Sequence, residues 1–194
     1  MNQSVSLKLK EGELFFRQWL RSPKSMGSVI PSSQALAKAI AGAVAWQPGQ
    51  YVVELGGGTG AITQGLLDRG IPRDRMIVIE LEEHLHSYLQ ERLPGSHVIK
   101  GDATKLDNIL EELGVDNVST VVSGLPMLGM PFEFHQAIVG QGLKAVADRG
   151  HMLQYTYSPV PPVPARKLGI RARLCKYVMW NFPPATVWRY TPRA

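Results

Sequence analysis

The sequence predicts an α/β fold in which a mostly parallel sheet carries helices on both faces. Three observations lead to this prediction. Apolar runs of strand length alternate with helix-length segments through most of the chain. A glycine-rich turn follows the first run. The last two runs follow each other without a helix between them, which predicts a terminal hairpin.

Five apolar runs are expected to form the parallel strands, and they are YVVEL (51–55), MIVIE (76–80), HVIKGD (97–102), STVVSGL (119–125) and GHMLQYTYS (150–158). Helices are expected between them at 60–69, 82–93, 104–113 and 132–147, and before them at 8–21 and 32–46. Ser32 or Ser33 is a suitable N-cap for the last of these. RARLCKYVMWNF (171–182) and TVWRY (186–190), separated by PPA, form the predicted hairpin.

Length and composition indicate a single globular domain. The 194 residues are enough for a sizeable core, and we divide them into an N-terminal segment at 1–31 and a main domain at 32–194. One cysteine, Cys175, excludes an internal disulfide framework, and no residues stand at metal-ligand spacing. No apolar run reaches the roughly 18–20 residues of a membrane span, and the N-terminus lacks a secretory signal. We expect a cytoplasmic monomer.

The net charge of +5 is unevenly distributed. Residues 1–24 hold five bases and two acids, and residues 25–158 hold nine bases and 14 acids. Residues 159–194 hold seven bases and no acid. Basic ends around an acidic body indicate an anionic partner, either a nucleic acid or a phospholipid surface.

Acidic residues end three successive predicted strands. Glu54 precedes the turn GGGTG (56–60), Glu80 ends the second strand and Asp102 follows the third. The turn also matches a dinucleotide fingerprint, but a carboxylate beside it disfavours a pyrophosphate and suits a cation. Glu80 suits ribose hydroxyls and Asp102 an adenine amino group. The three acids together describe a neutral or cationic adenosyl ligand.

This pattern resembles the class I S-adenosylmethionine-dependent methyltransferases, from about residue 35 to 192. The resemblance implies a Rossmann-like, mostly parallel seven-stranded sheet with a terminal antiparallel hairpin, and S-adenosylmethionine as cofactor with S-adenosylhomocysteine as product. The implied cofactor-binding residues lie along the three strand ends, and they are Glu54, Gly56, Gly58, Gly60, Glu80, Leu81, Asp102 and Ala103. A glycine turn that serves only helix–strand packing is the alternative.

The segment SGLPM (123–127) bears on the acceptor. Ribosomal RNA adenine dimethylases, which the chain also resembles, have an Asn- or Asp-led proline motif here that an aromatic ring closes. That ring stacks on the flipped base. Here Ser123 stands in the leading position and Met127 in the ring position. The stacking platform is missing, which argues against a nucleobase acceptor.

The N-terminal segment favours a lipid. FFRQWLRSPKSMGSVIPSS (15–33), together with ELGGGTG and SGLPM, resembles bacterial phospholipid N-methyltransferases, which act on phosphatidylethanolamine, and related ornithine lipid enzymes. The resemblance implies an amphipathic helix and basic residues that contact an anionic membrane or the lipid headgroup. The residues concerned are Phe15, Phe16, Arg17, Trp19, Arg21, Ser28, Arg166, Lys167 and Arg171. A helix packed on the core is the alternative.

Methyl transfer is governed mainly by placement of the acceptor amine. Ser123, the Leu125 carbonyl or a tyrosine hydroxyl are candidates for orienting it. Tyr155 and Tyr157 end the fifth predicted strand and, two residues apart, share one face. We assign no catalytic base. Half-buried sheet tyrosines are the alternative for this pair.

The sequence thus predicts a peripheral enzyme of the inner membrane face that converts phosphatidylethanolamine to mono-, di- or trimethylated products, a step in phosphatidylcholine biosynthesis. Three alternatives stay open: an ornithine lipid N-methyltransferase, an RNA adenine-N6 methyltransferase, and a non-catalytic membrane adaptor that binds the adenosyl ligand. Glu54 and Asp102 argue against a fourth, a dehydrogenase.

Overall fold

The computed structural model describes residues 33–193, apart from the side chains of 148 and 149. The predicted N-terminal helix at 8–21 and the loop to 31 lie outside these residues. The same holds for the substrate or membrane residues proposed there, which are Phe15, Phe16, Arg17, Trp19, Arg21 and Ser28.

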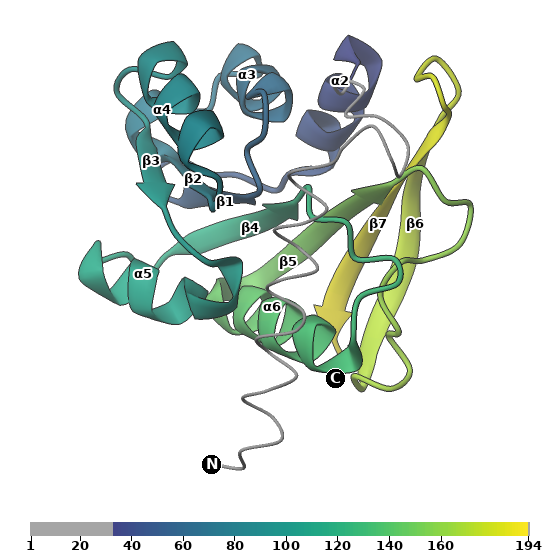
Figure 1. Cartoon of the computed structure of the whole chain (residues 1–194). Coiled ribbons are helices and arrows are strands. Elements are labelled where there is room, and N and C mark those ends of the chain that lie inside the picture. Colours follow the sequence, from purple (N-terminus) through teal and green to yellow (C-terminus); the bar gives the residue numbers. More distant parts are fainter. Residues whose placement is uncertain (1–32, 194) are drawn as a thin grey trace.

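A sheet of seven strands forms the centre of the molecule, in the order β3-β2-β1-β4-β5-β7-β6 (Figure 1). Strands β1 to β5 are parallel, and β7 pairs antiparallel with both β5 and β6. Their bounds are β1 Tyr51–Leu55, β2 Met76–Glu80, β3 His97–Lys100, β4 Val118–Ser123, β5 Val146–Thr156, β6 Ile170–Val178 and β7 Ala185–Pro192. The chain order reverses between β1 and β4, and ligands of such sheets bind beyond the strand ends at that reversal.

Helices cover the two faces of the sheet as separate layers (Figure 1). Their bounds are α2 Gln34–Ala43, α3 Ala61–Asp68, α4 Glu83–Arg92, α5 Leu106–Glu112 and α6 Phe132–Ala145, with short 3₁₀ helices η1 at Arg73–Arg75 and η2 at Ala103–Lys105. Helices α2, α3 and α4 lie on one face, and α5 and α6 lie on the other. Ser33 is the N-cap of α2, and its side chain accepts a hydrogen bond from the Leu36 amide.

Alternating side chains of each strand enter two apolar cores. Val52 packs with the α2–α3 side and Val53 with the α5–α6 side, and both are fully buried. This period of two places the side chain of Glu54 on the α3 face of the sheet. No helix of the described residues is long and apolar enough to cross a membrane.

The terminal hairpin differs from its prediction at the turn. Strand β6 ends at Val178, so residues 179–182, which the sequence placed in the strand, lie in the turn. Two successive prolines, Pro183 and Pro184, lack the amide hydrogens that continued strand pairing requires. Because β5 and β6 both run antiparallel to β7, the β6–β7 turn lies at the edge of the sheet that holds the carboxyl ends of β1–β5.

The start of β5 is a second difference. The strand begins at Val146, four residues before the predicted run, and α6 ends at Ala145. Val146 pairs with Val118 before a register shift carries the ladder to Thr120 and His151. The β-branched Val146 favours the extended backbone that follows the helix.

Candidate functional site

The glycine turn after β1 has two physical roles. Gly56, Gly58 and Gly60 have positive φ angles of 77°, 53° and 74°, which side-chain-bearing residues rarely adopt. A Cβ on Gly57 would lie 2.4 Å from Cγ1 of Val78, so the turn also packs directly on β2. A Cβ on Gly58 would have no neighbour within 4 Å. The turn is therefore tightly packed beneath Gly57 and open above Gly58, where a ligand has room.

Glu54 places a carboxyl in the interior just before this turn. Its side chain is 2% exposed, and Oε2 accepts a 2.6 Å hydrogen bond from the Thr63 hydroxyl of α3. Burial raises the pKa of Glu54 to about 8; the Thr63 hydrogen bond lowers it and the charge of Glu80 raises it. A positively charged ligand nearby would stabilise the ionised form of this group.

Glu80, at the end of β2, joins the turn to the next segment. Oε2 accepts from the Gly58 amide at 2.9 Å, and Oε1 accepts from the amides of Leu81 and Glu82 at 2.9 and 3.0 Å. A carboxylate offers about four acceptor positions, so about one remains in this arrangement. The two ribose hydroxyls expected at Glu80 need two acceptor positions. The Gly58 amide would therefore have to give up its hydrogen bond to Glu80 when the ligand binds.

Asp102 follows β3 and begins η2. Its Oδ1 accepts from the Thr104 amide at 2.8 Å, which fixes the carboxylate at the strand end. Leu81 and Ala103, the predicted contacts for the adenine, directly follow Glu80 and Asp102 and are half-buried. The structure thus brings the predicted cofactor residues to the carboxyl ends of three adjacent parallel strands, β1, β2 and β3.

These residues fit a cationic adenosyl ligand. The side chains that end the three strands are carboxylates, and one of them, Glu54, is buried with a raised pKa. One cation does approach the turn: Arg92 of α4 passes within 3.7 Å of a Cβ position on Gly60, and its Nη1 donates to the Tyr88 hydroxyl at 3.1 Å. Among the described residues no three His, Cys, Asp or Glu side chains form a metal-binding group.

The SGLP turn lies across the reversal of the sheet from the glycines. Ser123 is fully buried, and its hydroxyl accepts from the Leu125 amide at 3.3 Å. The Leu125 carbonyl accepts from Gln154 Nε2 at 3.0 Å and from the Met127 amide at 2.8 Å. These two contacts use both lone pairs of that carbonyl, so it has no position left for an acceptor amine in this arrangement.

Tyr155 is the predicted acceptor residue that reaches the junction of the two turns. A Cβ on Gly124 would lie 2.8 Å from the Tyr155 hydroxyl and 2.9 Å from the Gly56 carbonyl oxygen. The hydroxyl therefore lies beside both the cofactor turn and the SGLP turn. Strand β5 ends at Thr156, so the alternation that placed Tyr157 beside Tyr155 does not extend to it, and Tyr157 is 39% exposed.

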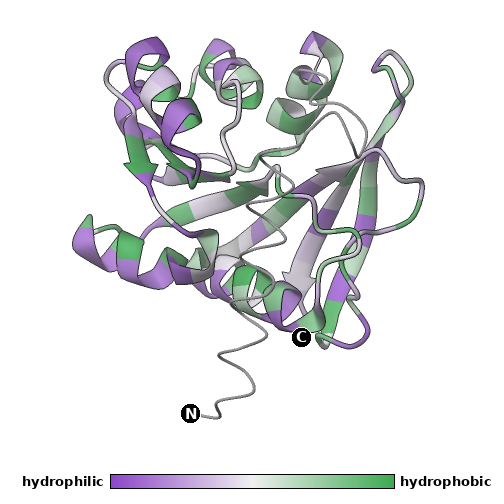
Figure 2. Ribbon diagram, in the orientation of Figure 1, coloured by the Kyte–Doolittle hydropathy of each residue, from purple (hydrophilic) through white to green (hydrophobic). Residues whose placement is uncertain are grey.

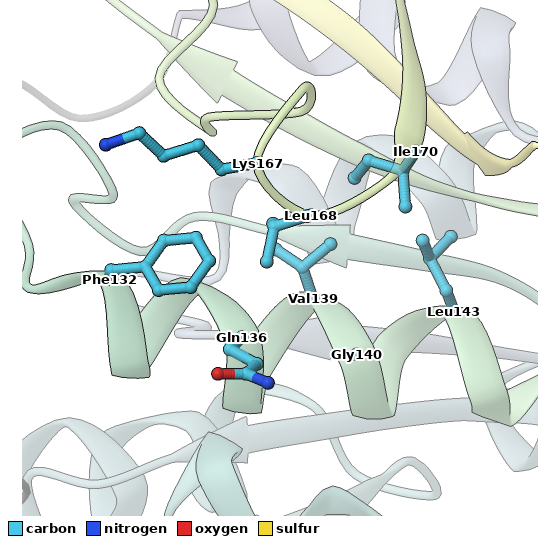
Figure 3. Close-up of a pocket in the computed structure, with 8 residues that line it drawn as sticks. All are labelled: Phe132, Gln136, Val139, Gly140, Leu143, Lys167, Leu168 and Ile170. Carbon is cyan, nitrogen blue, oxygen red and sulfur yellow. The ribbon is translucent and has the colours of Figure 1, made fainter.

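The predicted basic residues lie away from the three carboxylates. Arg166 and Lys167 are exposed in the β5–β6 connection, and Arg171 is exposed on the edge strand β6, opposite Thr191. Lys167 borders an apolar hollow of about 240 Å³ between α6 and the segment before β6 (Figure 3). Phe132, Gln136, Val139, Gly140, Leu143, Leu168 and Ile170 form the rest of its lining. None of the proposed cofactor residues contributes to this hollow.

Comparison with known proteins identifies the family. Residues 20–127 match the family model described as ribosomal RNA adenine dimethylase. The chain belongs to this family. Its members and its structural neighbours are S-adenosylmethionine-dependent methyltransferases, which confirms the predicted fold, enzyme class and cofactor.

Two relatives and one solved structure define the family position further. The chain is 32% identical to an ornithine lipid N-methyltransferase of Singulisphaera acidiphila, over 78% of this chain and 80% of that protein. It is also 32% identical to ribosomal RNA small subunit methyltransferase A of Thermotoga maritima, over 68% of this chain but only 48% of that enzyme. A TehB-like SAM-dependent methyltransferase from Corynebacterium glutamicum has the same fold, with 14% identity, a TM-score of 0.59 and coverage of 95% and 99% of the two chains.

Sequence reasoning missed three residues of the site. Thr63 bonds Glu54, Gln154 holds the SGLP turn, and Arg92 approaches the glycine turn. Gln154 did leave a signal, because it is a polar residue inside the apolar run HMLQY, where an amide is expected to have a specific partner. Thr63 and Arg92 lie on helices, and their partners follow only from how α3 and α4 pack.

Proposed function

We propose that this methyltransferase transfers methyl groups to the primary amine of a membrane lipid. Phosphatidylethanolamine is the substrate that the sequence predicts. The relative that matches over most of both chains is named for ornithine lipid, which makes that lipid the second acceptor to test. Both carry a primary amine near a polar headgroup, and both have to be reached at a membrane surface.

The burial of Met127 carries this proposal. In the position where an RNA adenine enzyme is expected to present a stacking ring, Met127 is 1% exposed and belongs to the core formed with Leu125, Met130 and Phe134. A flipped base needs a flat exposed surface on which to stack. A lipid amine needs no stacking surface. It needs only to be oriented and to find an acceptor for its hydrogen bonds, and a buried Met127 is compatible with both.

The residues around the SGLP turn have to place the amine. The cofactor supplies a methyl group already activated by its sulfonium, so in-line placement provides most of the acceleration, about 7–11 kcal/mol for well-oriented reactants. The Tyr155 hydroxyl lies beside both the glycine turn and the SGLP turn, which supports this role. We assign Tyr155 to orient the neutral amine through its hydroxyl oxygen.

RNA adenine methylation is the second candidate. The family description and the ribosomal RNA relatives favour it, and the basic C-terminal part of the chain suits a phosphate backbone. The chain spans about half the length of those relatives, so their whole activity does not follow from the match.

Methyl transfer from labelled S-adenosylmethionine separates these candidates. The full chain is incubated with phosphatidylethanolamine vesicles, ornithine lipid vesicles or structured RNA, with Tyr155→Phe as a matched variant. Label in a lipid product, reduced in the variant, supports the proposal, and chromatographic mobility gives the number of methyl groups. Label in RNA alone refutes it.

A further inference from the structure

Among the described residues, six of the ten exposed large apolar side chains lie in three loops, and the other four lie on α4, α6 and β6: Tyr88, Phe132, Leu174 and Tyr177. Leu128 follows β4, Tyr157 and Val160 follow β5, and the β6–β7 turn carries the most exposed ones. We name this set the apolar rim, and it consists of Leu128, Tyr157, Val160, Met179, Trp180 and Phe182. Parallel strands bring these loops to one edge of the sheet, and they lie along the right-hand side of Figure 1.

The hydrogen bonds of the β6–β7 turn hold its apolar side chains outward. Trp180 and Phe182 are 92% and 85% exposed, whereas Asn181 between them is 2% exposed. The Asn181 side chain accepts from the Ser33 amide at 3.1 Å and donates to the Pro183 carbonyl at 2.7 Å. The buried amide therefore fixes the turn to the start of α2, and its two neighbours have to project away from the protein.

The charge around this turn is positive. Residues 159–194 contain no acid, and α2 contains Lys38 and no acid, whereas Arg166, Lys167 and Arg171 lie toward the opposite end of β6. Lys176 is exposed on β6, two pairs before the turn begins. Hydrophilic colour covers α4 at the other end of the sheet, whereas hydrophobic colour reaches into the β6–β7 turn (Figure 2). An apolar, aromatic projection with lysines beside it and no acid in its own segment is complementary to an anionic lipid interface, where tryptophan rings preferentially lie.

We infer that the apolar rim is a membrane-docking surface, with Trp180 and Phe182 inserted among the lipid headgroups. Docking through this edge would turn the carboxyl ends of β1–β5, and with them Tyr155 and the SGLP turn, toward the bilayer. The inference rests on the proposed function, because a lipid substrate is the reason for the enzyme to bind a membrane. It adds a second contact surface, within the folded domain, to the one predicted in the N-terminal segment. RNA would engage the bases and could stack on the exposed rings, but it gains nothing from the aliphatic members of the rim, Leu128, Val160 and Met179.

Vesicle binding by the full chain tests the docking surface. Sedimentation with phosphatidylglycerol–phosphatidylethanolamine vesicles is compared for the native protein, Trp180→Ser/Phe182→Ser and Trp180→Phe. Each aromatic removed is expected to weaken partitioning by about tenfold, which corresponds to about 1.4 kcal/mol. Trp180→Phe should bind within about threefold of native, because the ring is retained. Tyr88→Ser, which removes a 43% exposed ring from α4, is the control and should bind as native does.

Two further readouts separate this inference from the proposed function. Lipids brominated near the headgroup should quench native fluorescence more strongly than that of Trp180→Phe, which locates Trp180 in the interface. Methylation of lipid dispersed in detergent micelles should be equal for native and Trp180→Ser/Phe182→Ser. Vesicle binding by the double variant within twofold of native overturns the docking surface, whatever lipid is methylated. Loss of binding without lipid methylation by native protein sustains the surface and refutes the proposed substrate.

Discussion

Replacing Glu54 by glutamine is expected to abolish most of the pH dependence of cofactor binding. Burial raises the pKa of Glu54 to about 8, so this carboxyl is mostly neutral at pH 7 in the free protein. A cationic ligand beside it favours the ionised form. Binding of S-adenosylmethionine below pH 8 should therefore release a proton from Glu54.

The size of the effect follows from that pKa. Between pH 6 and 7 the ionised fraction of a group with a pKa near 8 rises about tenfold, and the apparent affinity for the cofactor should rise by about the same factor. The increase should level off above pH 8. Glu54→Gln keeps the shape and loses the charge, so its affinity should be nearly constant from pH 6 to 8 and at least about fiftyfold weaker than native at pH 8, since the ionised fraction of Glu54 rises by about that factor between pH 6 and 8.

Isothermal titration calorimetry in two buffers of different ionisation enthalpy measures both quantities. Native protein should release close to one proton at pH 7, and Glu54→Gln should release almost none. Thr63→Val removes the hydrogen bond that lowers the pKa of Glu54 and should move the affinity rise to higher pH, whereas Thr63→Ser retains the hydroxyl. A native affinity that is flat from pH 6 to 8, with no buffer-dependent heat, would refute this role of Glu54.

Three further outcomes are expected. The pKa of Glu54 is raised on folding, so the unfolding free energy of native protein relative to Glu54→Gln should fall between about pH 4.5 and 8, by at most about 5 kcal/mol, in denaturant titrations. Gly57→Ala should lower the unfolding free energy by about 1–3 kcal/mol, because its Cβ meets β2. Gly58→Ala should lower the unfolding free energy by about 1–2 kcal/mol, because Gly58 has a positive φ. Gly58→Ala should also weaken cofactor binding more than Gly57→Ala does. Tyr155→Phe should lower the methyl-transfer rate about tenfold at unchanged cofactor affinity, whereas equal rates in Tyr155→Phe and Tyr157→Phe would contradict the assignment of the hydroxyl.

The sheet was predictable because its strands are apolar on both faces. YVVEL and MIVIE coincide with β1 and β2 as observed, since each run is bounded by glycine, proline or charge. Ends that depend on tertiary pairing were less predictable. The early start of β5 depends on the pairing of Val146 with Val118, and the length of β6 depends on where the hairpin turns. The sequence of one strand does not show which residues of the neighbouring strand it pairs with, or where the chain turns back.

The positions of the predicted cofactor residues in the fold were predictable for a different reason. Its residues stand directly after strands, and parallel strands bring their ends together whatever the details of packing, so Glu54, Glu80 and Asp102 follow from order alone. The acceptor half depends on side chains that meet across elements. The engagement of the Leu125 carbonyl by Gln154 and the end of β5 before Tyr157 both follow from register, which periodicity does not determine.

This division also explains why family membership leaves the acceptor open. The family match ends at residue 127, in the SGLP turn, so it covers the strands that carry the predicted cofactor residues and ends within the turn predicted to orient the acceptor. A cofactor site places the same demands on an RNA enzyme and a lipid enzyme: glycines that turn and carboxylates at strand ends. The demands differ from Met127 onward, at the buried Met127 itself, the exposed Leu128 and the apolar turn of Trp180 and Phe182. A base requires a ring on which to stack, and a lipid requires a route from the bilayer, so the residues from Met127 onward should decide which acceptor is methylated.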